Sequence, residues 1–290
     1  MSSSTDKQHY FVPDTTIWPF MASIGLTTLV MGFINILNEG GGKFLMVAGA
    51  AILFFTFWRW FGEVINESEG KIYTRWEDKS FRLGMSWFIF SEVMFFAAFF
   101  GVLFYARVLS LPWLSGVGEG FDTNQWLWEG YKAVWPENAN GPGNVGGDYQ
   151  VMGAWGLPTL NTILLLTSGV TLTWAHHALK EGNRQHLIWG LTATVVLGAL
   201  FMGCQILEYS HAYHTNLTLG SGIYGSTFFL MTGFHGLHVT LGAIILFVVL
   251  MRARRGHFTP ENHFAFEAAA WYWHFVDVVW LILFVFVYWI

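Results

Sequence analysis

Charge and cysteine are scarce in this sequence. Of its 290 residues only 11% are charged, and Cys204 is the single cysteine. Ordinary soluble chains carry roughly 25% charged residues. A lone cysteine excludes an internal disulfide and a cysteine-rich metal site. The net charge of −5 comes with no basic tract suited to nucleic acid, and the polar first sixteen residues predict no cleavable signal peptide.

Hydrophobic residues, in contrast, make up 54% of the chain, and phenylalanine alone occurs 28 times. A soluble fold of this length cannot bury so much apolar surface, so we expect lipid to be the solvent for much of it. Crossing the hydrocarbon core takes about 20 mostly apolar residues. We therefore predict an all-α membrane protein, a single membrane domain over residues 1–290 with seven transmembrane helices. The helices are expected at about 17–37, 44–64, 83–109, 152–179, 187–209, 224–251 and 264–290.

Lysine and arginine gather in alternate connections between these helices, and cytoplasmic loops are the ones that retain them. The connections after the second, fourth and sixth helices hold Lys71, Arg75, Lys79, Arg82, Lys180, Arg184, Arg252, Arg254 and Arg255. With seven spans, this pattern predicts a cytoplasmic N-terminus and an external C-terminus. The long connection 110–151 is rich in Gly, Asn, Pro and Trp. We expect an external loop without helical period there, and its role stays open.

Glu92 is an ionisable residue about ten positions into the third predicted helix. Burying such a group in a membrane costs several kcal/mol unless it is paired, so it is a candidate functional residue. Its neighbours three and four positions away are the apolar Phe88, Ile89, Phe95 and Phe96. Two interpretations remain open: a functional carboxylate, or an acid that only fixes packing through a hydrogen bond to another helix.

Further buried polar candidates lie in the last two predicted helices. His274 and Asp277 are three residues apart and share a helix face, which favours a structural hydrogen-bonded pair over a proton relay. His235 and His238 also share a face. A haem usually takes histidines from facing helices, so hydrogen-bonding histidines are favoured over haem or copper ligands.

We predict no catalytic residue and no metal ligand in the chain. His176 and His177 are adjacent, so their side chains point about 100° apart on a helix and do not both face one metal. Glu208 and Glu267 lie near predicted helix ends, where a charge is less costly to keep.

Several motifs resemble those of subunit III of cytochrome c oxidase. They are SEVMFF (91–96), WAHH (174–177), YGSTFF (224–229), TGFHGLH (232–238) and FEAAAWYWHFVDVVW (266–280). The resemblance runs from about residue 10 to the C-terminus. It implies a non-redox core subunit of a proton-pumping, oxygen-reducing cytochrome c oxidase of aerobic respiration, without an active site of its own.

The resemblance also implies partners and an architecture. Haem A and copper would be held by partner subunits, with subunit I in direct contact and subunit II and small subunits in the same complex. Subunit III of this family packs beside subunit I, stabilises it against turnover-linked inactivation and supports proton uptake. Its helices divide as two plus five around a V-shaped cleft that holds phospholipid.

Individual residues carry the resemblance further. Glu92 matches the family's mid-membrane, carbodiimide-reactive glutamate, and Trp60, Glu67 and Arg252 match positions near lipid headgroups. The chain departs from common family residues at Phe61, Asn66 and Tyr73. The external connection is longer than in mitochondrial relatives, which favours a bacterial source and location in the bacterial inner membrane.

Three alternatives are kept open. Glu92, Asp277 and the buried histidines motivate an autonomous proton or small-solute transporter, although no internal repeat supports one. A quinol-oxidase-type subunit III is a second alternative, but those relatives usually lack the first two helices. A haem cytochrome that uses His235 or His238 is the third.

Overall fold

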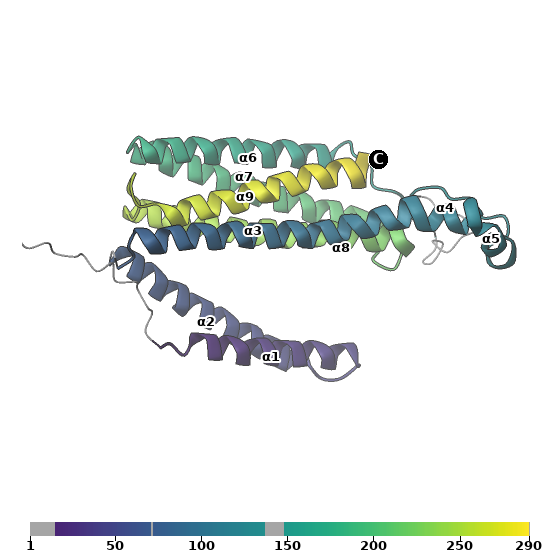
Figure 1. Ribbon diagram of the computed structural model, residues 1–290, viewed down its shortest axis with the longest axis horizontal. Helices are drawn as coiled ribbons and strands as arrows, with labels where there is room; N and C mark the ends of the chain where they lie inside the picture. The colour runs from purple at the N-terminus through teal and green to yellow at the C-terminus, as the bar shows by residue number, and fades with distance from the viewer. Residues whose placement is uncertain (1–14, 71, 137–147, 290) are drawn as a thin grey trace, which may run out of the picture. The chain divides into compact units, whose positions relative to one another are not determined.

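The computed structural model describes residues 15–70, 72–136 and 148–289, and within these ranges the chain forms helices and no strand. By its internal contacts the chain divides into two compact units, residues 1–83 and 84–290. The boundary falls inside helix α3 (Arg75–Phe104). Figure 1 labels the helices of both units, and each unit is described by itself.

The smaller unit is a hairpin of α1 (Trp18–Leu37) and α2 (Lys43–Glu69). Its two helices pack backbone against backbone. A Cβ atom on Gly32 would lie 2.3 Å from the backbone nitrogen of Met46, and one on Gly49 would lie 2.3 Å from that of Leu29. Small residues permit such close contact between membrane helices. The contact between α1 and α2 therefore depends on glycine. Most of the large apolar side chains of the hairpin are exposed and available to lipid.

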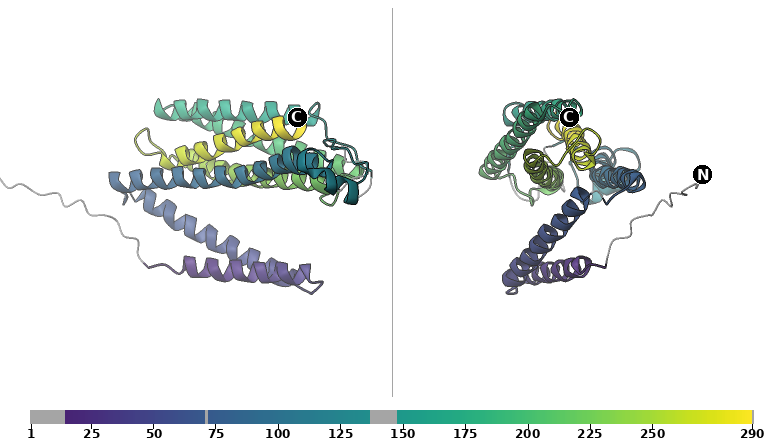
Figure 2. Two further views of the ribbon diagram at one scale, coloured as in Figure 1. Left: turned by 45° about the vertical axis from the view of Figure 1, so that its right-hand side comes forward. Right: turned by 90° about the vertical axis from the view of Figure 1, so that its left-hand side faces the viewer.

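The larger unit is a helical bundle that contains the rest of α3 and four further long helices. These are α6 (Leu157–Lys180), α7 (Arg184–His214), α8 (Gly222–Arg255) and α9 (Phe264–Leu283). Helix α7 packs against α6 and α8, and α9 packs against α6 and α8, which closes a four-helix arrangement. Aromatic contacts join α3 to α8 and α9, and Figure 2 shows these helices running side by side.

Local sequence explains where several of these helices begin and end. Pro158 lies in the first turn of α6, where its missing N–H has no helical partner to lose. The side chain of Asn183 caps α7 by accepting a hydrogen bond from the backbone of His186 at 3.2 Å. Gly256 ends α8 with a φ of 81°, a left-handed conformation that glycine adopts without steric cost.

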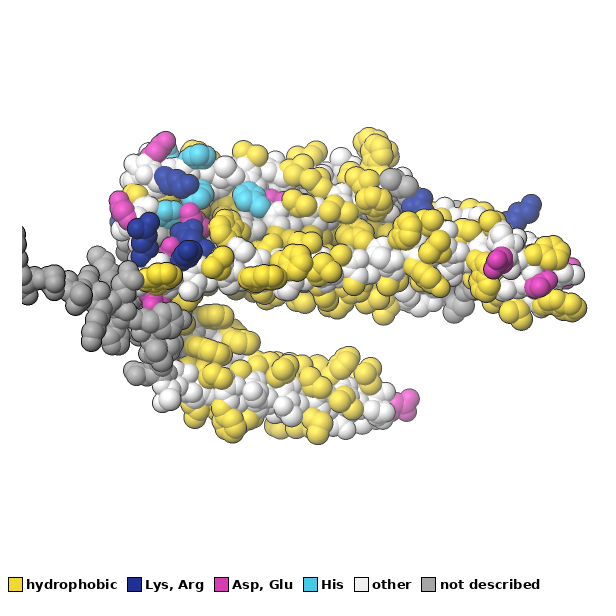
Figure 3. All heavy atoms as spheres, in the orientation of Figure 1, with side chains coloured by type: hydrophobic (Ala, Val, Ile, Leu, Met, Phe, Trp, Pro, Cys, Tyr) yellow, Lys and Arg dark blue, Asp and Glu magenta, His cyan; other side chains and the backbone are white. Residues whose placement is uncertain are grey.

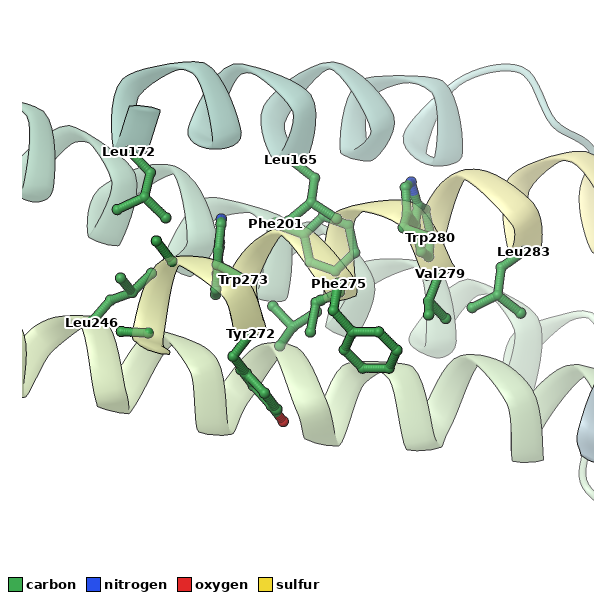
Figure 4. Packing of buried hydrophobic residues seen from close by; sticks show 14 of the residues in the cluster. Leu165, Leu172, Phe201, Leu246, Tyr272, Trp273, Phe275, Val279, Trp280 and Leu283 are labelled. Carbon is green, nitrogen blue, oxygen red and sulfur yellow. The ribbon is translucent and has the colours of Figure 1, made fainter. Parts of the chain in front are cut away.

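The core of the bundle is built around two tryptophans of α9 (Figure 4). Trp273 and Trp280 are fully buried. Each indole N–H donates to a hydroxyl of α6: that of Trp273 to Ser168 at 2.8 Å and that of Trp280 to Thr162 at 2.9 Å. A buried indole thus brings its apolar surface into the core and satisfies its only donor. The hydroxyl-rich face of α6 is what makes this possible.

Six helices in the described part of the chain are long and apolar enough to cross a membrane. Helix α6, which overlaps the predicted span 152–179, is not among them. Its sequence contains five threonines together with Asn161 and Ser168, and these polar side chains lower its hydropathy. The seven-helix count therefore stays a prediction, while the all-helical, membrane-spanning class is confirmed.

Helix ends differ from the predicted boundaries in one consistent way. Helices α2, α3, α7 and α8 continue beyond the apolar runs into charged sequence, since a helix needs backbone hydrogen bonds and not apolar side chains to continue. The connection 110–151 also contains helix that we did not predict. A π-helical turn (Tyr105–Ser110) joins α3 to α4 (Leu111–Leu114), and α5 (Phe121–Leu127) follows.

The surface of the larger unit separates by residue type. Figure 3 shows apolar side chains along its flank, with lysine, arginine, histidine and acidic side chains densest at one end and a few lysine, arginine and acidic side chains at the other. That end holds the last turns of α6 and α8 and the first turn of α7, which carry Lys180, Arg184 and three arginines of α8. An apolar belt with a charged end is the surface expected of a membrane bundle.

Candidate functional site

Glu92 and His238 form a hydrogen-bonded pair between α3 and α8. Oε2 of Glu92 lies 2.8 Å from Nε2 of His238, a length typical of hydrogen bonds in which one group is ionised. The side chains are 21% and 11% exposed, respectively. The acid singled out in the sequence thus has a partner on another helix, and that partner is one of the two histidines singled out in α8.

The second hydrogen bond of His238 fixes how its ring is protonated. Nδ1 lies 2.7 Å from the backbone carbonyl oxygen of Phe234. A carbonyl oxygen only accepts, so Nδ1 carries a hydrogen. Nε2 then either accepts from a protonated Glu92 carboxyl, or donates as an imidazolium to a Glu92 carboxylate. In both states one proton lies between Oε2 and Nε2, and the pair has no net charge.

Aromatic rings surround the pair. The ring of His238 has its centroid 5.0 to 6.5 Å from those of Phe95, Phe96, Tyr272 and Phe275. Tyr272 lies nearly parallel to the imidazole, at an interplanar angle of 20°. Such rings exclude water and lower the local dielectric constant, which strengthens the hydrogen bond and makes separation of its charges costly. The site therefore favours keeping its proton shared within the pair.

His235 takes no part in this pair. Its Nε2 donates to the backbone carbonyl of Val276 on α9 at 3.2 Å, and its ring contacts Phe201 and Trp280. The two histidines of α8 share a face, as predicted, but they turn toward different helices. His235 serves the contact with α9, and His238 the contact with α3.

His274 and Asp277 form the predicted i, i+3 pair on α9, with Nδ1 and Oδ2 separated by 3.4 Å. Asp277 is buried, and the side chain of His274 is 44% exposed. A Cβ on Gly169 of α6 would lie 2.5 Å from Oδ2 of Asp277, so only glycine leaves room for this carboxyl. The pair lines an open groove of about 620 Å³ between α6 and α9, together with Thr173 and His177.

Of the three residues assigned to lipid headgroups, Trp60 and Glu67 belong to the smaller unit. Trp60 is half-buried on α2. Glu67 accepts a hydrogen bond from the hydroxyl of Tyr73 at 2.5 Å. Burial raises the pKa of the Tyr73 hydroxyl, and the hydrogen bond and negative charge of Glu67 raise it further. Tyr73, one of the departures from the family pattern, thus binds the carboxylate that the pattern marks.

Arg252, the third residue assigned to lipid, lies in the last turn of α8 in the larger unit. Its guanidinium carbon lies 4.9 Å from the ring centroid of Phe258, a cation–π contact. Most of the side chain is buried. Arg252 is therefore held in place by the turn that follows α8.

Comparison with known proteins covers almost the whole chain. The family profile described as cytochrome c oxidase subunit III matches residues 8–122 and 141–290. The chain belongs to this family. Proteins named cytochrome c oxidase subunit 3 are 41% identical in Marchantia polymorpha, over 99% of this chain and 98% of the relative, and 39% identical in Arabidopsis thaliana, over 98% and 97%. The one from Dasypus novemcinctus is 40% identical over 100% of this chain and 99% of the relative.

Membership of the subunit III family confirms the resemblance found in the sequence motifs and makes the chain part of an oxidase complex. With six helices suited to spanning a membrane, it is a multi-pass membrane protein. These three relatives come from two plants and an animal, and the bacterial source stays a prediction.

Sequence reasoning was wrong about Glu208 of this subunit III chain. Helix α7 continues to His214, so Glu208 lies well inside it and is fully buried. Its Oε1 accepts a hydrogen bond from the Tyr288 hydroxyl at 2.6 Å. The helical spacing could have indicated this burial, because Phe201, Gln205 and Glu208 recur at four and three residues and form one buried face.

A second group that we did not foresee lies at the charged end of the bundle. His176 of α6, His263 just before α9, and Glu267 in the first turn of α9 have their ligand atoms within 4.8 Å of one another. His176 turns toward this group, whereas His177 lines the groove beside Asp277. The predicted divergence of the adjacent histidines is confirmed, but their separate surroundings were not predictable from spacing.

Proposed function

We propose that this subunit III chain is a non-redox core component that packs beside subunit I of cytochrome c oxidase. It would stabilise subunit I during turnover and support proton uptake, with haem A and copper held by partner subunits, including subunits I and II. The Glu92–His238 pair is the observation that carries the proposal. It is a neutral, one-proton pair inside the apolar part of the bundle, and Glu92 keeps a fifth of its side chain exposed.

Such a pair suits a position next to a proton path. Moving the proton from Oε2 to Nε2 changes where the charge lies but not the net charge of the pair. The pair therefore avoids most of the cost of burying an isolated ion in a membrane. A charge that arrives nearby in subunit I would bias the proton toward one atom or the other, which couples the two subunits electrostatically.

Lipid contact forms the second part of the proposal. A guanidinium binds a phosphate through two parallel hydrogen bonds, and tryptophan favours the headgroup region. Trp60 and Glu67 in the smaller unit and Arg252 in the larger unit would each contact phospholipid headgroups. From the distribution of lysine and arginine, we place the N-terminus in the cytoplasm and the C-terminus in the periplasm, in a bacterial inner membrane.

Two substitutions of Glu92 separate proton exchange from packing. Glu92→Gln keeps the size of the side chain, and its amide still donates to Nε2 of His238, but it holds no exchangeable acid proton. Glu92→Ala removes both functions. We expect both variants to assemble with normal haem spectra, and both to show slower proton uptake and several-fold fewer turnovers before inactivation. Ser91→Ala, at the exposed neighbouring position, is the matched control and should behave as wild type.

The measurements are oxygen consumption with reduced cytochrome c until activity is lost, and proton uptake followed with a pH indicator. A Glu92→Gln variant with wild-type lifetime and proton uptake, beside an impaired Glu92→Ala variant, would show that the pair serves packing only. That result would end the proposed role in proton uptake.

A further inference from the structure

His176, His263 and Glu267 form the one group of three metal-ligating side chains that the described residues bring together. They come from the end of α6 and the beginning of α9, at the charged end of the bundle seen in Figure 3. Oε1 of Glu267 lies 3.3 Å from Nε2 of His263 and 3.6 Å from Nε2 of His176. One carboxylate oxygen thus faces two imidazole nitrogens.

Hydrogen bonds from the two imidazoles to Glu267 do not account for these separations. Protein N–H···O bonds have donor–acceptor distances of about 2.7–3.2 Å, and both separations are longer. The Nε2 atoms of His176 and His263 are buried, and neither has a hydrogen-bond partner. Leaving a buried polar atom without a partner destabilises the fold, so two such atoms facing the same carboxylate call for a ligand between them.

The orientation of His263 strengthens this reasoning. Its Nδ1 donates to the backbone carbonyl of Thr259 at 3.1 Å, so in the neutral ring Nε2 carries a lone pair directed at Glu267. A metal-ligating histidine typically donates its other ring N–H to a carbonyl or carboxylate in this way. The side chain of His263 is 8% exposed, which holds the ring in this orientation.

The two separations from Glu267 are close to those between ligand atoms of a tetrahedral metal. Zinc binds histidine nitrogen and carboxylate oxygen at about 2.0–2.2 Å, which puts two ligand atoms of a tetrahedral site about 3.3–3.5 Å apart. The separations of 3.3 and 3.6 Å fall close to this range. Two imidazoles and one carboxylate favour zinc or a similar transition metal over magnesium and calcium, which prefer oxygen ligands alone.

We propose that His176, His263 and Glu267 bind a divalent transition-metal cation of the zinc type, with water in the fourth position. The site goes beyond the proposed role of Glu92, and it departs from the sequence expectation that the chain holds no metal ligand. Its ion joins the last turns of α6 to the first turn of α9. Glu267 supplies the negative charge, and Lys180, four residues after His176 on α6, is the opposing cation nearby.

The test measures zinc in the intact oxidase complex, purified through this chain, treated with a chelator and then given zinc chloride. The amount of zinc per complex is determined by inductively coupled plasma mass spectrometry in wild type and in His263→Ala, His176→Ala and Glu267→Gln. We expect each variant to hold one zinc ion fewer than wild type, with affinity lower by at least about 10–100-fold, the loss that even outer-shell changes cause. His177→Ala, whose side chain lines the groove instead, is the control and should keep the zinc.

Two further measurements keep the outcome decisive. Glu267→Gln preserves shape, so it answers the question even where an alanine variant does not assemble. X-ray absorption at the zinc edge is compared before and after zinc is added to the chelator-treated complex. The difference spectrum of wild type should show two imidazole nitrogen ligands, and that of His263→Ala should lack them. Equal zinc content in wild type and Glu267→Gln overturns the site, and so does zinc loss in His177→Ala. Neither result bears on Glu92, whose test is the lifetime of the enzyme under turnover.

Discussion

Replacing Gly198 of α7 with alanine places a methyl group against the indole of Trp273. The new Cβ would lie 2.7 Å from Cη2 and 3.1 Å from Cζ2 of that ring, whereas carbon atoms in favourable contact are about 3.5–4.0 Å apart. The indole has little freedom to retreat. Its N–H is held by Ser168, and on α8 a Cβ at Gly242 would already lie 2.9 Å from the same ring.

The expected cost follows from this fixed ring. Adding a methyl group to a well-packed core typically costs about 1–3 kcal/mol. Since about 1.4 kcal/mol corresponds to a factor of ten, the unfolding equilibrium should shift by roughly 5–150-fold. Gly203→Ala on the same helix is the matched control, because a Cβ there has nothing within 4 Å. There the higher helix propensity of alanine should stabilise by about 0.5–1 kcal/mol.

The assay is thermal denaturation of the purified complex, in which release of this subunit at each temperature is measured on native gels. Gly198→Ala should lower the midpoint, and Gly203→Ala should leave it unchanged or raise it. Trp273→Phe shortens the ring, so its combination with Gly198→Ala should be less destabilised than the sum of the two single variants. Equal midpoints for Gly198→Ala and Gly203→Ala would refute the view that the Trp273 contact limits the packing of α7.

Two further predictions concern hydrogen bonds to carboxylates. Burial, and then Glu67, raise the pKa of the Tyr73 hydroxyl in the folded protein. The contribution of Tyr73 to stability is therefore complete below the unfolded pKa of about 10, and it is lost as the pH rises above that value. Tyr73→Phe should therefore flatten the alkaline fall in stability measured by denaturation between neutral and high pH; an unchanged fall would mean that another group causes it. Tyr288→Phe removes the donor to the buried carboxyl of Glu208 and should destabilise the protein by about 1–3 kcal/mol. Phe284→Leu, in the same π-helical segment Phe284–Trp289, is the control and should cost less. A thermal midpoint of Tyr288→Phe equal to that of wild type would show that Glu208 does not need this donor.

Much of the fold could be predicted because it depends on solvent and on local pattern. Apolar runs of about 20 residues require lipid, and their helical hydrogen bonds close within each segment. Helix ends were less predictable, as α7 and Glu208 show, because a helix can continue past the end of its apolar run. Helix α6 shows the opposite limit: its threonines and serine lower its hydropathy, yet they accept the indole hydrogen bonds of Trp273 and Trp280.

Of the two residues of the candidate site, the sequence predicted the acid but did not identify its partner. The sequence indicated that Glu92 needed a partner, because an unpaired carboxylate is costly in a membrane. It did not indicate which of several histidines would supply that partner, since His238 lies 146 residues away. The choice between His235 and His238 depended on how α8 is rotated against α3 and α9, a property of packing that the spacing of three residues does not contain.

By itself, then, the sequence determined the solvent, the helical class, the family and the acid that had to be paired. The tertiary structure alone decided the pairings: Glu92 with His238, Glu208 with Tyr288, Trp273 between Gly198 and Gly242, and Glu267 with His176 and His263. The physical reason is the range of the forces involved. Hydrophobic burial and helix formation act on each segment and leave a local pattern, whereas hydrogen bonds and close packing join atoms that meet only after the helices have assembled.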